Sequence, residues 1–141
     1  MTPLVLLLLL LLAASICDLR RREIPDWVPL AMLAWAAAAA AAGIGGATWL
    51  GAACGFAVGL ALSAPLFYLG GIGGGDVKLI AALGAALGPW PLAACLLWIA
   101  IFGGILAGIA SLRGQKDFAY APAMFLGLAA FALRSLEWSH V

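Results

Sequence analysis

The sequence predicts an all-α, polytopic membrane protein of about six transmembrane helices. Hydrophobic residues make up 67% of the 141 residues and charged residues only 9%, proportions that soluble domains of this size do not have. Eighteen glycines and long alanine runs suit helices that pack closely in lipid. Glycine and proline clusters divide the apolar sequence into six segments. We therefore expect one membrane domain over residues 1–141, with the lipid bilayer as a partner. No basic patch accompanies the net charge of +1, which argues against nucleic-acid binding.

The first apolar segment, residues 3–17, is expected to be a retained helix rather than a cleaved signal. A secretory signal carries its positive charge before the apolar run, whereas Arg20, Arg21 and Arg22 follow it here. By the positive-inside rule, the C-terminal end of this helix faces the cytoplasm.

Five further helices are expected from the same glycine and proline boundaries. The second and third are predicted at about 28–42 and 49–69, and the fourth runs from after Asp76 to the GPWP sequence at 88–91. The fifth and sixth are predicted at about 92–112 and 121–136. With six crossings, only Arg134 lies near the outer side of the membrane. The other basic residues all lie on the cytoplasmic side: Arg20, Arg21, Arg22, Lys78, Arg113 and Lys116. The fourth helix has about 12 residues and spans roughly 18 Å, less than the ~30 Å hydrocarbon core. We expect the glycine loop before it to dip into the bilayer.

Two carboxylates are predicted to meet at the cytoplasmic side of the membrane. Asp18 ends the first helix and Asp76 begins the fourth, so two complete crossings separate them. Two aspartates that share a proton can carry out aspartic-protease chemistry: the ionised one draws a proton from water while the other polarises the peptide carbonyl. A plainer interpretation is that Asp76 caps its helix and that Asp18 pairs with the arginines after it. Proton-coupled transporters also use paired carboxylates, although their sites usually lie near the midplane.

The other reactive residues give weaker signals. The three cysteines form no CxxC pair and have no partner histidines, so neither a zinc site nor a disulfide framework is indicated. The single histidine, His140, lies on the opposite side from the other candidates, which argues against a Ser-His-Asp arrangement. We expect no metal and no cofactor. Asp26, Asp117 and Glu23 are interpreted mainly as loop charges.

Three stretches resemble elements of the prepilin peptidases, also called type IV leader peptidases. "DLRRREIPDW" at 18–27 resembles the D-x6-P-[DN] element that follows the first core helix of that family. "GGGDVKL" at 73–79 resembles its GxGD signature, which is shared with intramembrane aspartic proteases. "YAPAMFLG" at 120–127 is similar to the proline-containing segment that opens the last helix. Because the order and spacing also agree, the resemblance covers essentially the whole chain.

The resemblance implies an aspartic endopeptidase and assigns its site residues. Asp18 and Asp76 match the two catalytic aspartates, one in each signature. The supporting residues that it implies are Gly73, Gly75, Lys78, Ile24, Pro25 and Asp26.

The resemblance also implies where the protein acts and on what. The substrate is expected to be a prepilin or pseudopilin, an apolar helix with a short basic leader that is cut at the cytoplasmic face of the bacterial inner membrane. The pilus assembly machinery is a further expected partner. Many family members carry an N-terminal CxxC region associated with N-methylation, which this sequence lacks, so it resembles the short, peptidase-only members of Flp-type (tight adherence) pilus systems. The alternative function is a small proton-coupled transporter or a pilus-assembly scaffold.

Overall fold

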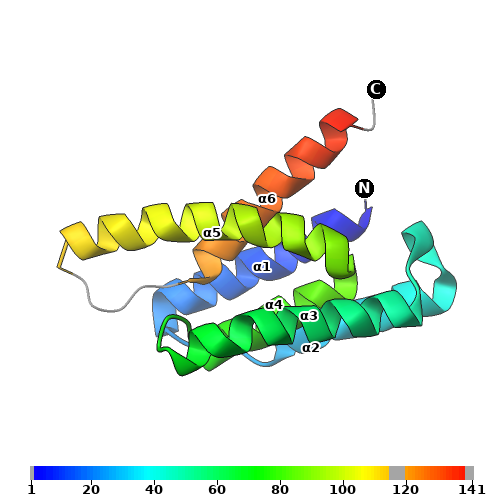
Figure 1. Cartoon of the computed structure of the whole chain (residues 1–141), viewed down its shortest axis with the longest axis horizontal. Coiled ribbons are helices and arrows are strands. Elements are labelled where there is room, and N and C mark those ends of the chain that lie inside the picture. The colour runs from blue at the N-terminus through cyan, green and yellow to red at the C-terminus, as the bar shows by residue number, and fades with distance from the viewer. Residues whose placement is uncertain (1, 115–119, 139–141) are drawn as a thin grey trace. The chain divides into compact units, whose positions relative to one another are not determined.

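The computed structural model describes residues 2–114 and 120–138, and these ranges contain six α-helices, one short 3-10 helix and no strand. The elements, in order along the chain (Figure 1), are α1 (Thr2–Arg21), α2 (Trp27–Ala42), η1 (Ile44–Gly46), α3 (Trp49–Tyr68), α4 (Gly74–Leu87), α5 (Pro89–Leu112) and α6 (Ala121–Trp138). The predicted all-α class is confirmed.

Three helix ends differ from the predicted ones by three residues or more. Helix α1 continues past residue 17 to Arg21, and Arg22 then takes a left-handed conformation (φ 55°) while its N–H donates to the Asp18 carbonyl at 2.9 Å. Helices α4 and α5 each begin three residues earlier than predicted, at Gly74 and Pro89. Glycine and proline are tolerated in a first helical turn because the N–H groups there have no partner within the helix.

The chain forms two compact units. One contains Glu23–Ala93, with α2, η1, α3, α4 and the start of α5; the other contains Met1–Arg22 and Ala94–Val141, with α1, most of α5 and α6.

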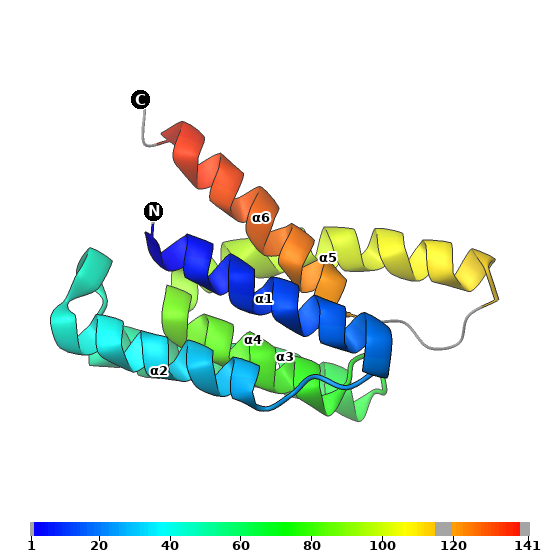
Figure 2. The same ribbon diagram turned by 180° about the vertical axis from the view of Figure 1, so that it is seen from behind.

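In the Glu23–Ala93 unit, α3 and α4 form a closely packed antiparallel pair, and α2 lies along α4 (Figures 1 and 2). Gly55 faces Gly84, and Gly59 faces Ile80. A Cβ atom at Gly59 would lie 2.7 Å from the carbonyl oxygen of Ile80 and 2.9 Å from the Cα of Ala81. The glycines therefore let the two backbones approach each other, as small residues do in membrane helix pairs.

In the other unit, α1 and α6 pack antiparallel, and α5 contacts α6 through a glycine. The buried side chains of α1 and α6 include Leu7, Leu11, Met124 and Leu128. A Cβ atom at Gly127 would lie 2.7 Å from the Cα of Ile99, so only glycine fits at this point of α6. This packing holds the start of α6 beside the last turn of α1.

The helices have the surface expected of a membrane protein. Helices α3 and α5 are long and apolar enough to cross a membrane. Only 17% of the most apolar 18-residue stretch of α3, and 22% of that of α5, is buried. Helices α2 and α6 contain shorter apolar spans. Large exposed side chains on α3 and α5 include Leu62, Leu66, Ile101 and Ile105. Exposure of this many large apolar side chains is typical of contact with lipid or with another helix rather than with water.

Candidate active site

Asp18 is a buried carboxylate held by the start of another helix. It lies in the last turn of α1, its residue is 8% exposed, and its Oδ2 accepts the N–H of Ala121 at 3.2 Å. Ala121 is the first residue of α6, Pro122 has no N–H, and the N–H of Ala123 donates to the carbonyl of Tyr120. The N–H of Ala121 has no acceptor within α6, and Asp18 supplies one. The positive end of the α6 dipole also favours a carboxylate there.

Asp76 is the second buried carboxylate, and it is held by the start of its own helix. Gly73 is the N-cap of α4, and Asp76 is the third residue of the helix. Its Oδ2 accepts the Gly73 N–H at 3.0 Å, and the residue is 7% exposed. This is the N3 half of a capping box. The plainer interpretation of Asp76 as a capping residue is thus confirmed, although Asp76 caps from N3 rather than from the N-cap position.

Glycines make room for the Asp76 carboxylate and for a neighbouring side chain. A Cβ atom at Gly73 would lie 3.3 Å from Asp76 Oδ2. A Cβ atom at Gly75 would lie 3.0 Å from the Cβ of Ile24, which precedes α2. Of the supporting residues, Gly73 therefore contacts Asp76 directly, whereas Gly75 and Ile24 fix how the chain before α2 lies on the first turn of α4.

Lys78 and Asp26, predicted separately as supporting residues, form an ion pair. The Lys78 Nζ lies 2.7 Å from Asp26 Oδ1, and their side chains are 59% and 69% exposed. Asp26 follows Pro25, whose carbonyl accepts the N–H of Val28 at 3.1 Å and so forms the turn into α2. An exposed pair of this kind contributes about 0–1 kcal/mol to stability. It joins the start of α2 to α4.

The remaining candidates fall outside the site or outside the described residues. Asp117, Lys116 and His140 are outside the described residues, and Glu23 is exposed. Cys17, Cys54 and Cys95 are free thiols. Among residues 4–114 and 120–134, whose side chains the structure describes, no group of three or more His, Cys, Asp or Glu could hold a metal ion.

Ala121 is the site residue that sequence reasoning missed. The sequence "YAPAMFLG" contained a signal for it, because a proline close to the start of an apolar segment marks the first turn of a helix. The N–H of Ala121, just before that proline, is then a first-turn donor with no acceptor in its own helix. Asp18 and Ala121 belong to one compact unit, and Asp76, Gly73, Ile24 and the Lys78–Asp26 pair belong to the other.

Fold and site together define an all-α membrane protein with two buried aspartates, each accepting a backbone N–H at a helix N-terminus. The family model of the type IV leader peptidases matches residues 5–109, a range that contains both aspartates, and the chain belongs to this family. It is 33% identical over 137 residues to the prepilin leader peptidase/N-methyltransferase of Bacillus subtilis (strain 168), an alignment that covers 89% of this chain and 52% of that relative. The chain thus spans about half the length of the curated relative. No solved structure matches it.

Proposed function

We propose that this protein is a membrane aspartic endopeptidase that removes the short N-terminal leader from type IV prepilins of the Flp type. The observation that carries the proposal is that Asp18 and Asp76, each within its own unit, have similar surroundings. Both lie in the range matched by the family model, both are buried, and both accept a backbone N–H at a helix N-terminus. Backbone donors orient a carboxylate without neutralising it, which suits a group that must exchange protons during a reaction.

In the proposed mechanism the two aspartates act as a pair that shares one proton. The ionised carboxylate takes a proton from a water molecule, and the water oxygen attacks the carbonyl carbon of the scissile peptide. The protonated carboxyl donates a hydrogen bond to the carbonyl oxygen, where negative charge develops. The carboxyl that took the proton from water then gives it to the amide nitrogen as the C–N bond breaks, so the amine leaves and the carboxylate is restored. The backbone N–H groups of Ala121 and Gly73 hold one oxygen of each carboxylate, so that the rotation of each group is restricted.

The proposed setting is the cytoplasmic face of the bacterial inner membrane, which the chain crosses several times. A prepilin of the kind expected for this family is an apolar helix preceded by a basic leader, so its scissile bond lies where the helix leaves the bilayer. The arginines after α1 follow the positive-inside pattern, and they begin two residues after Asp18. This position in the sequence supports a location of Asp18 at the level of such a bond.

Co-expression of the chain with an Flp-type prepilin tests the proposal through the change in pilin mass on leader removal. Asp18→Asn and Asp76→Asn should each reduce cleavage to background, because each removes half of a pair that works as a unit. Asp26→Asn is the matched control and should retain most activity, since its carboxylate is exposed and paired with Lys78. Membrane content of each variant is measured by immunoblotting. Full cleavage by either Asp18→Asn or Asp76→Asn would refute the assignment of the pair.

A further inference from the structure

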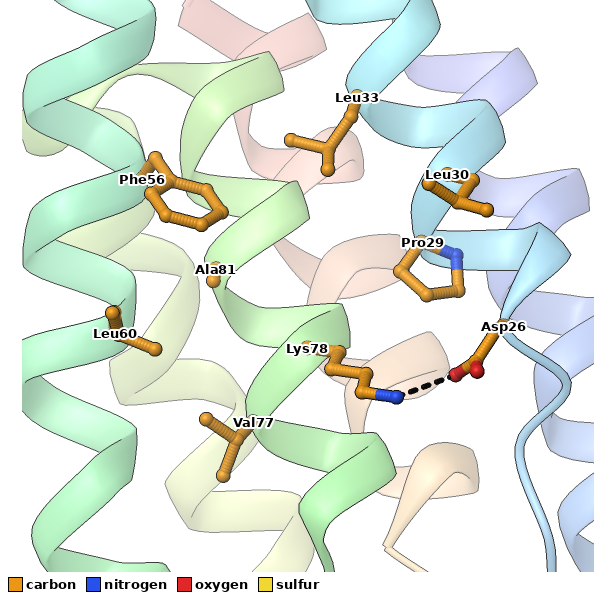
Figure 3. Close-up of a pocket in the computed structure, with 9 residues that line it drawn as sticks. All are labelled: Asp26, Pro29, Leu30, Leu33, Phe56, Leu60, Val77, Lys78 and Ala81. Atoms are coloured by element: carbon orange, nitrogen blue, oxygen red, sulfur yellow. Dashed lines mark hydrogen bonds and ion pairs between the residues drawn. The ribbon is translucent and has the colours of Figure 1, made fainter.

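A groove of about 320 Å³ lies between α2, α3 and α4 in the Glu23–Ala93 unit (Figure 3). Its α4 wall consists of Val77, Lys78 and Ala81. At 3.6 residues per turn these three residues span roughly 100° of the helix surface, and Asp76 lies about 100° beyond Val77. The groove and the Asp76 carboxylate therefore occupy different sides of α4.

The groove is polar at one end and apolar along the rest of its length. Figure 3 shows the Lys78–Asp26 ion pair at one end and Leu33 and Phe56 at the other. Leu33 follows Asp26 by seven residues, or about 10 Å of helix. Charged residues at helix starts are suited to the headgroup level of a membrane, and the apolar end then lies in the hydrocarbon region.

The ion pair can bind a further charge of each sign without separating. The ammonium of Lys78 has three donors and uses one of them for Asp26, and the Asp26 carboxylate can accept several hydrogen bonds. Both side chains are more than half exposed. The pair is neutral overall, so it complements a group that carries both a phosphate and an ammonium better than a group with a net charge.

The apolar lining of the groove suits a hydrocarbon chain. A single acyl chain can lie against Leu30, Leu33, Phe56 and Leu60, which line its apolar part. Such contact supplies the van der Waals packing that stabilises apolar surfaces within a bilayer.

We propose that this groove binds a phospholipid with a primary ammonium headgroup, phosphatidylethanolamine. One acyl chain lies along Leu30, Leu33, Phe56 and Leu60, the phosphate accepts hydrogen bonds from Lys78, and the ethanolamine ammonium donates to Asp26. The grounds for this lipid site do not include the proposed peptidase activity.

Native mass spectrometry of the full chain tests this site. The protein is purified from vesicles of equal parts phosphatidylethanolamine, phosphatidylglycerol and phosphatidylcholine with identical acyl chains. We expect one retained phosphatidylethanolamine, at least fivefold over either other lipid, because phosphatidylglycerol lacks the ammonium and phosphatidylcholine lacks its N–H donors. Leu60→Trp should fill the groove and abolish retention. Leu62→Trp is the matched control, since residue 62 is also an exposed leucine of α3 but does not line the groove.

Asp26→Asn provides a second variant that changes charge rather than shape. It leaves Lys78 without an anionic partner, so retention should shift from phosphatidylethanolamine towards phosphatidylglycerol. Equal retention of the three lipids, or equal retention by Leu60→Trp and Leu62→Trp, would overturn the proposal. It would also be overturned if an apolar transmembrane peptide displaced phosphatidylethanolamine and cross-linked to a photoreactive residue at position 60, because the groove would then be a helix-docking surface. The measured quantity is bound mass, so neither result depends on peptide cleavage.

Discussion

The carboxylate of Asp18 in α1 accepts the N–H of Ala121 in α6 at 3.2 Å, across 103 residues of sequence. Asp18 thus lies near the C-terminus of its own helix, whose dipole disfavours a negative charge, and at the N-terminus of another, whose dipole favours one. The contact joins the first and third of the stretches that resemble family elements. It gives the "YAPAMFLG" stretch a physical role, which is to hold one of the two proposed catalytic carboxylates.

Replacing the amide of Ala121 by an ester should impair cleavage without unfolding the protein. Incorporation of lactic acid at position 121 removes the N–H and leaves the side chain unchanged. A hydrogen bond to a charged group contributes about 1.5–3 kcal/mol, so we expect a decrease in kcat of tenfold or more with little change in KM. Steady-state cleavage of a prepilin peptide in detergent, over a range of peptide concentrations, measures both quantities.

An ester at Ala130 is the matched control for this substitution. Ala130 lies in the middle of α6, so the same chemical change there removes a hydrogen bond within the helix and none to Asp18. A role for the Ala121 N–H in helix stability alone would give equal losses in thermal stability and no difference in kcat between the two esters. That pattern would show that Ala121 does not position Asp18.

Gly75→Ala should be harmful, whereas Gly74→Ala should be tolerated. A Cβ atom at residue 75 would lie 3.0 Å from the Cβ of Ile24, but one at residue 74 would lie 3.6 Å from the ring of Phe67, an ordinary contact. Overpacking costs about 1–3 kcal/mol, whereas alanine in a helix is favoured over glycine by about 1 kcal/mol. Thermal unfolding in detergent should order the proteins as Gly74→Ala, wild type and Gly75→Ala, from most to least stable.

A second substitution at Ile24 tests the cause of that loss. Ile24→Ala removes the Cδ1 atom that would lie 3.3 Å from the new Cβ at residue 75. The double variant should therefore recover part of the stability lost in Gly75→Ala. Strictly additive losses would indicate that the Ile24 atoms beyond Cβ do not cause the loss.

Gly59→Ala should destabilise the α3–α4 pair by about 1–3 kcal/mol. The added Cβ would meet the backbone of Ile80 and Ala81, which cannot rotate away as a side chain can. Gly104→Ala in α5 is the control, because a Cβ there meets no atom within 4 Å. Tryptophan fluorescence during heating in detergent follows both variants. Equal unfolding temperatures would contradict the close approach of the two backbones.

Reporter fusions should place Arg21 and Lys78 on the cytoplasmic side and Gly45 and Pro89 on the other side. Alkaline phosphatase is active only outside the cytoplasm and green fluorescent protein fluoresces only inside it, so fusions of both at each position give complementary signals. Opposite locations for Arg21 and Lys78 would place the two aspartates at opposite membrane faces and would refute the proposed pair.

The sequence by itself determined the class of the protein and the positions of its two principal carboxylates. Hydropathy is a local property, so the apolar segments and their glycine and proline boundaries gave the six helices with ends correct to within a few residues. The order and spacing of the short elements around Asp18 and Asp76 pointed to the family that the comparisons confirm. These signals need no knowledge of how the helices pack.

Only the tertiary structure decided which groups meet. The Asp18–Ala121 hydrogen bond and the Lys78–Asp26 ion pair join residues 103 and 52 positions apart, and the packing of Ile24 on Gly75 depends on how the chain before α2 lies on α4. The groove likewise requires α2, α3 and α4 to be packed together. Such contacts arise from the close approach of helix backbones at glycines, which depends on the shapes of both partners and leaves no periodic pattern in either one.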